Sequence, residues 1–240
     1  MLIINADDWG RSRAETDAAW ACHERGRITS VSAMVFMEDS RRAADLAKGA
    51  GIDVGLHLNL TQPFSGEGPP RRLTDRHDRV VRFLTSSKYA FLIYNPALTA
   101  QFRYDYQSQV DEFQRLYGRR PSHIDGHHHQ HLCTNILFGG IIPKGEKVRR
   151  NFYFWPGEKS LTNRTYRRLV DLTLTRRYRV TDYFFALAQC LHSDRMRRVC
   201  ELAKNATVEI MTHPNEAAEH TYLLGDACLA DFSQLERGTH

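Results

Sequence analysis

The chain alternates short apolar runs with segments in which apolar residues recur every three or four positions. The short runs predict buried strands, and the periodic segments predict helices that pack one face against them. The expected strands are 2–6, 28–36, 52–61, 122–127, 147–154, 180–187 and 207–212. The expected helices are 14–26, 39–51, 99–118 and 193–205. Strands that alternate with helices predict a parallel α/β sheet, and 240 residues suit a single domain over 1–240.

One stretch breaks this alternation, and a second contains an unusual cluster of basic residues. Residues 61–84 are rich in Pro, Gly and Arg and follow a strand directly, which suits a binding loop and a surface insertion equally well. Residues 140–180 contain the basic cluster "RTYRRLVDLTLTRRYR" at 164–179. Its helical apolar spacing favours a solvated helix face over a binding surface. We expect these two stretches to determine which substrate the protein accepts.

Composition places the chain among ordinary globular proteins, with 42% hydrophobic and 25% charged residues. The net charge of +5 is dispersed apart from that cluster, so we expect no nucleic-acid partner. Five cysteines without a C-x-x-C pair indicate a reducing compartment. No run has the length of a signal sequence or a membrane span, so we predict a cytoplasmic protein.

Polar residues gather where four expected strands end. Asp7 and Asp8 follow the first strand, and His57 lies within "GLHLNLT". The stretch "HIDGHHHQH" at 123–131 closes a third strand, and His213 follows the last. Each residue alone has an ordinary explanation as a cap or a hydrogen-bonded core group. Parallel strands bring these ends together, however, and unpaired buried groups of this kind are costly, so we predict one shared site.

Imidazoles and carboxylates without thiolates suit a borderline divalent metal ion such as zinc. Two histidines with one carboxylate leave coordination positions open, which is typical of catalytic sites. The adjacent Asp7 and Asp8 offer one ligand and one general base. The residues therefore predict metal-assisted hydrolysis, with the substrate left open.

The motifs "NADDWG", "TSVSAMV", "GLHLNLT", "HIDGHHHQH" and "EIMTHP", in this order, resemble those of the YdjC-like carbohydrate deacetylases. The resemblance runs from residue 2 to about residue 236, and the combination of motifs is more specific than any one of them. It implies a distorted TIM-barrel-like (β/α) fold and removal of acetyl from an N-acetylated sugar. It also implies one divalent ion, described in the family as magnesium, and a homodimer.

The resemblance also implies roles for individual residues. The metal ligands would be Asp8, His57 and His127, the general base Asp7, and the general acid or a substrate contact His213. We assign five further residues to the substrate side of the site: Asn59, Asp125, His129, His131 and Arg150.

Some interpretations stay open at this stage. Asp125 and His123 share the strand face of His127 and could orient it, while His128 should point the other way. Arg149 and Arg150 suit substrate hydroxyls and solvent equally well. Two other functions are weighed against deacetylation: a phosphoesterase with two metal ions, and a non-catalytic sugar- or metal-binding module. The sequence does not identify the acetylated sugar.

Overall fold

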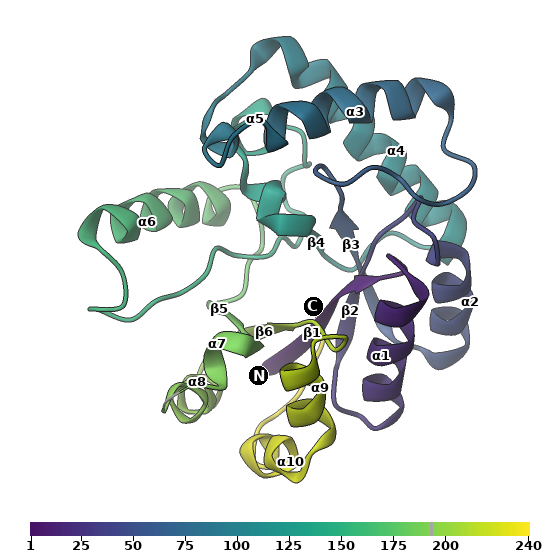
Figure 1. Ribbon diagram of the computed structural model, residues 1–240. Coiled ribbons are helices and arrows are strands. Elements are labelled where there is room, and N and C mark those ends of the chain that lie inside the picture. Colours follow the sequence, from purple (N-terminus) through teal and green to yellow (C-terminus); the bar gives the residue numbers. More distant parts are fainter. Residues whose placement is uncertain (193) are drawn as a thin grey trace.

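A six-stranded parallel sheet, in the order β4-β3-β2-β1-β6-β5, organises the computed structural model, which describes residues 1–192 and 194–240. The strands are β1 (Leu2–Trp9), β2 (Ser30–Ala33), β3 (Asp53–Leu58), β4 (Ile124–Gly126), β5 (Tyr183–Ala186) and β6 (Val208–Thr212). The sheet curls into a half-barrel with the helices on its outside (Figure 1). The expected distorted TIM-barrel-like α/β fold is thereby confirmed.

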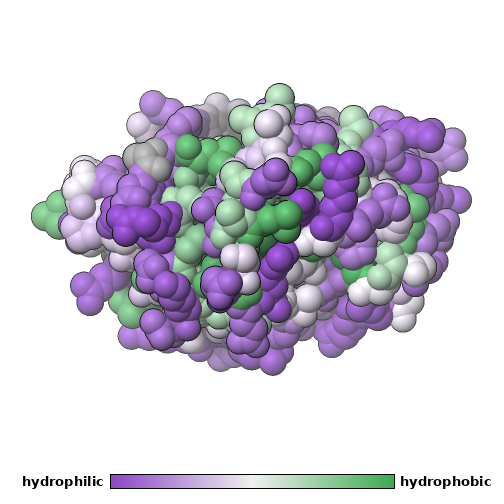
Figure 2. Space-filling view, turned by 90° about the horizontal axis from the view of Figure 1, so that it is seen from below, coloured by the Kyte–Doolittle hydropathy of each residue, from purple (hydrophilic) through white to green (hydrophobic). Residues whose placement is uncertain are grey.

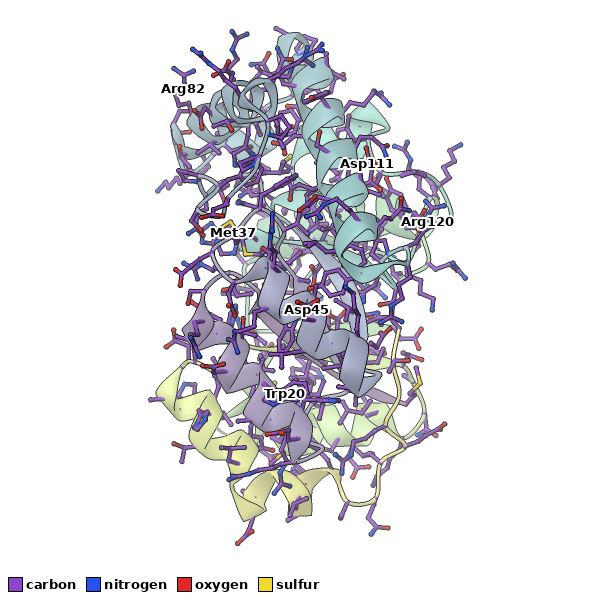
Figure 3. The ribbon with its side chains drawn as sticks, turned by 90° about the vertical axis from the view of Figure 1, so that its right-hand side faces the viewer. Trp20, Met37, Asp45, Arg82, Asp111 and Arg120 are labelled. Atoms are coloured by element: carbon purple, nitrogen blue, oxygen red, sulfur yellow. The ribbon has the colours of Figure 1, made fainter. Side chains whose placement is uncertain are left out.

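Ten α-helices occur in the described residues: α1 (Arg13–Glu24), α2 (Ser40–Ala50), α3 (Arg71–Thr85), α4 (Thr99–Tyr117), α5 (Thr134–Gly139), α6 (Leu161–Thr175), α7 (Leu187–Cys190), α8 (Arg195–Ala203), α9 (Ala217–Leu224) and α10 (Asp226–Phe232). Short 3-10 helices span Ala90–Leu92, Pro96–Leu98 and His127–Leu132. Figure 3 shows α1, α2 and α4 in a row on one side of the molecule, with Trp20, Asp45 and Asp111 marking them in turn.

The hydrophobic core lies between the sheet and these helices. All eight residues of β1 are buried, as expected for a strand covered on both faces. The predicted apolar stripe of α4 is confirmed, since its members are all buried: Phe102, Tyr106, Val110, Phe113 and Tyr117. Hydrophilic residues cover most of the face in Figure 2 and leave smaller hydrophobic patches between them. No helix among the described residues is long and apolar enough to cross a membrane.

The prediction of a strand at 147–154 is wrong. The backbone N–H of Val148 donates to the carbonyl of Arg179 at 2.9 Å. The backbone N–H of Arg149 donates to the carbonyl of Ile124 at 3.0 Å. Farther along, the N–H of Tyr153 donates to the carbonyl of Phe184 at 2.9 Å. Because the partners change within a few residues, only isolated bridges form here and no ladder develops. The segment lies between the β4 side and the β5 side of the half-barrel.

Helix α3 corrects a second expectation. The loop expected from residue 61 to about 84 ends at Pro70, and Arg71–Thr85 is helical. Leu73, His77, Val80 and Leu84 form its buried face, spaced as on a helix. The abundant arginines hid this pattern because they occupy the exposed positions between the buried ones.

Candidate active site

Three buried side chains from separate strand ends converge at one edge of the sheet. Asp8 belongs to β1, His57 to β3, and His127 follows β4. Asp8 Oδ1 lies 3.0 Å from His127 Nδ1 and 3.4 Å from His57 Nε2. Asp8 has a left-handed backbone with φ of 63°, at the point where the register between β1 and β2 shifts. This conformation is uncommon for a residue other than glycine and marks a constrained position.

The donor atoms of these three residues fit a metal ion. They all lie within 4.8 Å of one another and are buried. Asp8 Oδ1 has no well-aligned hydrogen-bond donor among the described residues. His57 Nδ1 is 2.8 Å from Asp125 Oδ1, which leaves Nε2 free to face the ion. An imidazole oriented by a carboxylate in this way is typical of metal-binding histidines.

The electrostatics of the cluster favour positive charge. Burial alone would raise the pKa of Asp8, but the imidazoles of His127 and His57 hold it well below its usual range. Burial alone would lower the pKa of His57, but Asp125 and Asp7 outweigh it and raise that pKa to about 10. Carboxylates that stabilise a proton on His57 equally stabilise a divalent cation beside it.

Arg149 holds the carboxylates behind this cluster. It is 1% exposed. Its Nη1 and Nη2 donate to the two oxygens of Asp7, each at 2.7 Å, and Nη2 is also 2.6 Å from Asp125 Oδ2. Its Nε donates to Glu209 Oε1 at 2.7 Å. Arg149 therefore faces three buried carboxylates, and neither substrate hydroxyls nor solvent reach its guanidinium.

Two features of this network were not recognised from the sequence. One is the buried Glu209, and the other is the role of Arg149 as the cation that pairs with buried carboxylates. A signal was present, because a glutamate inside the apolar strand "TVEIMT" requires a buried partner. Nothing local to Arg149 reveals that it is this partner, since the two residues lie on segments sixty positions apart.

Polar side chains of β1 and β2 also hold the carboxylates of Asp7 and Asp125 in place. Asn5 Nδ2 donates to Asp7 Oδ1 at 2.9 Å, and Ser30 Oγ donates to Asn5 Oδ1 at 2.7 Å. Ser32 Oγ donates to Asp125 Oδ2 at 2.7 Å. Asp7 and Asp125 are thus each fixed by Arg149 and by a neutral donor, which orients them firmly.

A cavity of about 330 Å³ opens in front of the cluster. Its lining includes the three residues of the cluster and the neighbouring Asp7, together with residues from the loops after β4 and β6: Asp7, Asp8, Arg11, His57, Gly126, His127, His128, His129, Met211, His213, Asn215 and Glu216. His213 is positioned through its backbone, whose N–H donates to Glu219 Oε2 at 2.8 Å. The cavity therefore brings together the residues assigned to the metal, the base and the acid, and one of the five assigned to the substrate, His129.

The other four residues assigned to the substrate do not line this cavity. Asn59 closes a turn, where its Oδ1 accepts from the backbone of Thr61 and Gln62. Asp125 is fully buried against His57, and it orients that residue instead of His127. His131 is also fully buried. Arg150 points elsewhere, with its Nη1 2.6 Å from the carbonyl of Asp182.

The strand expected over 122–127 covers only Ile124–Gly126, so the alternation expected to continue to His127 and His128 ends at Gly126. A 3-10 helix follows, and His128 and His129 have left-handed backbones with φ of 53° and 56°. Both line the cavity as a result, although His128 was expected to point away. His123 lies apart from His127, close to Gly55 and 3.0 Å from Ser32 Oγ.

His131 leads to a prediction about pH. Burial lowers the pKa of His131 to about 4, below the ordinary imidazole value of 6.5. Between these values the unfolded chain binds a proton that the folded chain does not, so the free energy of unfolding falls as the pH drops from 6.5 to 4. His131→Gln should reduce that fall by roughly 3 kcal/mol at pH 4. Urea unfolding across this range measures it, with His192→Gln, at an exposed position, as the control. Equal slopes for both variants and the unmodified protein would contradict the assignment.

The fold and the site together define an α/β protein with a buried carboxylate–imidazole cluster at the carboxyl ends of its strands, and the atoms of this cluster are spaced so that they could hold a metal ion. A family model described as YdjC-like protein matches residues 1–237, and the chain belongs to this family.

Relatives with described activities match part of the chain. A chitooligosaccharide deacetylase from Proteus mirabilis (strain HI4320) is 35% identical over 140 residues, which cover 57% of this chain and 52% of that protein. A carbohydrate deacetylase from Mus musculus is 31% identical over 144 residues, which cover 56% and 44%. These alignments span about half the length of the curated relatives.

One solved structure shares the fold along nearly the whole chain. It is a proposed cellobiose-phosphate cleavage protein from Enterococcus faecalis V583, with a TM-score of 0.61 and 19% identity, covering 97% of this chain and 94% of that one. At this identity the likeness concerns the fold alone.

Proposed function

We propose that the protein is a metal-dependent deacetylase that removes the acetyl group from an N-acetylated sugar. The observation that carries the proposal is that Asp7 and His213 line the same cavity as the cluster of Asp8, His57 and His127. A general base, a general acid and a metal site around one cavity are what amide hydrolysis by water requires. The curated relatives, named as chitooligosaccharide and carbohydrate deacetylases, support this reading.

In this proposal the chain's own residues orient the reactants and move the protons. A divalent ion held by Asp8, His57 and His127 would supply a Lewis acid for the amide carbonyl and the attacking water. Asp7 accepts the proton of that water, and Arg149 keeps its carboxylate in one orientation. His213, which lines the same cavity, protonates the departing amine of the sugar.

The site suits one metal ion better than two. A second group of potential ligands consists of Asp7, His57 and Asp125. Both of its carboxylates already contact the guanidinium of Arg149, whose positive charge disfavours another cation there. The structure therefore gives no support to a phosphoesterase with two metal ions. Two imidazoles and one carboxylate favour zinc or a related transition ion, whereas the family resemblance implies magnesium.

Acetate release tests the proposal directly. Purified protein is incubated with a panel of N-acetylated sugars after chelation and after separate addition of zinc or magnesium, and the bound metal is counted. We expect acetate from at least one sugar, loss of this activity on chelation, and one ion per chain. Tight sugar binding without acetate release would identify a non-catalytic binding module instead, and two ions per chain would favour the phosphoesterase.

A further inference from the structure

A buried histidine outside the catalytic cavity takes no part in the chemistry described above. His77 lies on the buried face of α3. Its Nδ1 is 2.7 Å from Asp105 Oδ2 of α4, and its Nε2 is 2.8 Å from the carbonyl oxygen of Gln62, in the segment that follows β3. Figure 1 shows α3 and α4 side by side. His77 therefore joins these two helices to the chain that leaves the carboxyl end of β3.

The hydrogen-bond geometry indicates a protonated imidazole at this position. Nε2 faces a carbonyl oxygen, which only accepts, and Nδ1 faces a carboxylate. A neutral imidazole has a single N–H and donates to only one of them, whereas an imidazolium donates to both. Burial alone would lower the pKa of His77, but Asp105 and the Gln62 carbonyl outweigh it and raise that pKa. The ring of Phe64 stacks on that of His77 with 3.9 Å between centroids, a contact that a cation strengthens.

His77 belongs to a closed ring of hydrogen bonds. Gln109 Nε2 donates to Asp105 Oδ1 and to the carbonyl oxygen of Asn59, each at 2.7 Å. Asn59 Nδ2 donates to the Gln62 carbonyl at 2.7 Å, where His77 also donates. Four members of the ring are fully buried: His77, Asp105, Gln109 and Asn59. A satisfied buried network of this kind holds the turn at 59–62 in one arrangement.

The turn held by this ring reaches the catalytic cavity through Thr61. The Oγ1 of Thr61 is 3.0 Å from His128 Nδ1. His128 lines the cavity, and its ring centroid is 4.0 Å from that of His127, a proposed metal ligand. The left-handed backbone of His128 is uncommon for a residue other than glycine, so its position depends on neighbouring contacts. Thr61 supplies one such contact.

We propose that His77 is a positioning residue of the deacetylase: as an imidazolium it closes this ring, holds the turn at 59–62, and thereby keeps His128 in place at the wall of the catalytic cavity. The inference rests on the proposed function and adds to it a residue of α3, a helix that contributes no residue to the lining of that cavity. Asn59, assigned to the substrate side from the sequence, acts through the same turn.

The proton on His77 makes this arrangement sensitive to alkaline pH. The pKa of His77 is higher in the folded chain than in the unfolded chain, so its contribution is present at low and neutral pH and is lost as the pH rises through the folded-state pKa. The charged groups that act on this pKa are Asp105 from α4 and Asp78 from α3 itself. Segment 59–66 and the 3-10 helix Ala90–Leu92 also pack against α3, and they contain no acidic or basic side chain.

His77→Gln tests the proposal in steady-state kinetics of acetate release. The single nitrogen of glutamine cannot donate at both positions, so the turn and the cavity wall loosen. We expect KM to rise about tenfold, the effect of one lost buried hydrogen bond. The values of kcat and metal content should stay close to those of the unmodified protein, because His77 touches neither substrate nor metal ligands. Val80→Ala, on the same buried face of α3, is the matched control, which weakens helix packing and should leave KM unchanged.

The double variant His77→Gln/Asp105→Asn provides the rescue. Its new glutamine amide donates to the Gln62 carbonyl and accepts from the new asparagine amide, so the ring closes again without a charge. KM should return close to that of the unmodified protein, and the rise of KM at alkaline pH, expected for the unmodified protein, should be absent. The proposal is overturned by a KM that His77→Gln leaves unchanged, that the double variant does not restore, or that Val80→Ala raises equally.

NMR of isotopically labelled histidine rings in metal-free protein provides a readout independent of catalysis. We expect both ring nitrogens of His77 to be protonated at neutral pH, and the ring signals of His128 to shift in His77→Gln but not in Val80→Ala. This result, without acetate release from any sugar, would reject the proposed function and keep the role of His77 at the cavity wall. A neutral His77 at neutral pH, or His128 signals that His77→Gln leaves unchanged, overturns the inference even if the protein is an active deacetylase.

Discussion

Asp7→Asn is expected to lower kcat for acetate release by about a thousandfold, the usual contribution of a positioned general base. Asparagine has the size of aspartate but cannot accept the proton of the attacking water. Asp8, His57 and His127 remain unchanged, so the metal content should stay at the level of the unmodified protein. Steady-state kinetics on the best N-acetylated sugar, with metal analysis of the same sample, measures both quantities.

His127→Ala provides the contrast for this experiment. It removes a proposed metal ligand, so activity and metal content should fall together. Asp17→Asn, an exposed change on α1, controls for the substitution itself and should behave like the unmodified protein. If Asp7→Asn retains activity within tenfold, or loses its metal as His127→Ala does, then Asp7 is not the base.

The sequence was sufficient to predict the parallel sheet and the convergence of the site. Each strand is a short apolar run, and a parallel arrangement puts all its carboxyl ends on one edge. Asp8, His57 and His127 could be grouped for this reason, since each interrupts or follows such a run. Strand order was not needed, because the carboxyl ends of parallel strands lie on one edge of the sheet whatever their order.

The orientation of side chains beyond the strand ends could not be predicted in the same way. His128 and His129 leave the strand pattern because their backbones are left-handed, and residues other than glycine rarely adopt this conformation. Asp125 contacts His57 on β3 instead of His127, a pairing across strands that depends on register. Alternation along one strand carries no information about either feature.

Arg149→Met is expected to lower the free energy of unfolding by about 4 kcal/mol, because it leaves buried carboxylates without their cation. Asp7, Asp125 and Glu209 all contact this guanidinium within 2.7 Å. Methionine fills much of the volume of arginine, so lost packing contributes little to the change. Urea unfolding of metal-free protein gives the value without a contribution from ion binding.

Arg150→Met is the matched control, since the neighbouring arginine is partly exposed and pairs with Asp171 near the surface. Its side chain is 24% exposed, and replacing such a pair should cost about 1 kcal/mol or less. Adding Glu209→Gln to Arg149→Met should recover part of the lost stability, because glutamine carries no charge that needs a buried cation. Burial already raises the pKa of Glu209 to about 7 even with Arg149 beside it. Equal free energies of unfolding for Arg149→Met and Arg150→Met would show that the three carboxylates do not depend on the Arg149 cation. The orientation of the Asp7 carboxylate would then need another explanation.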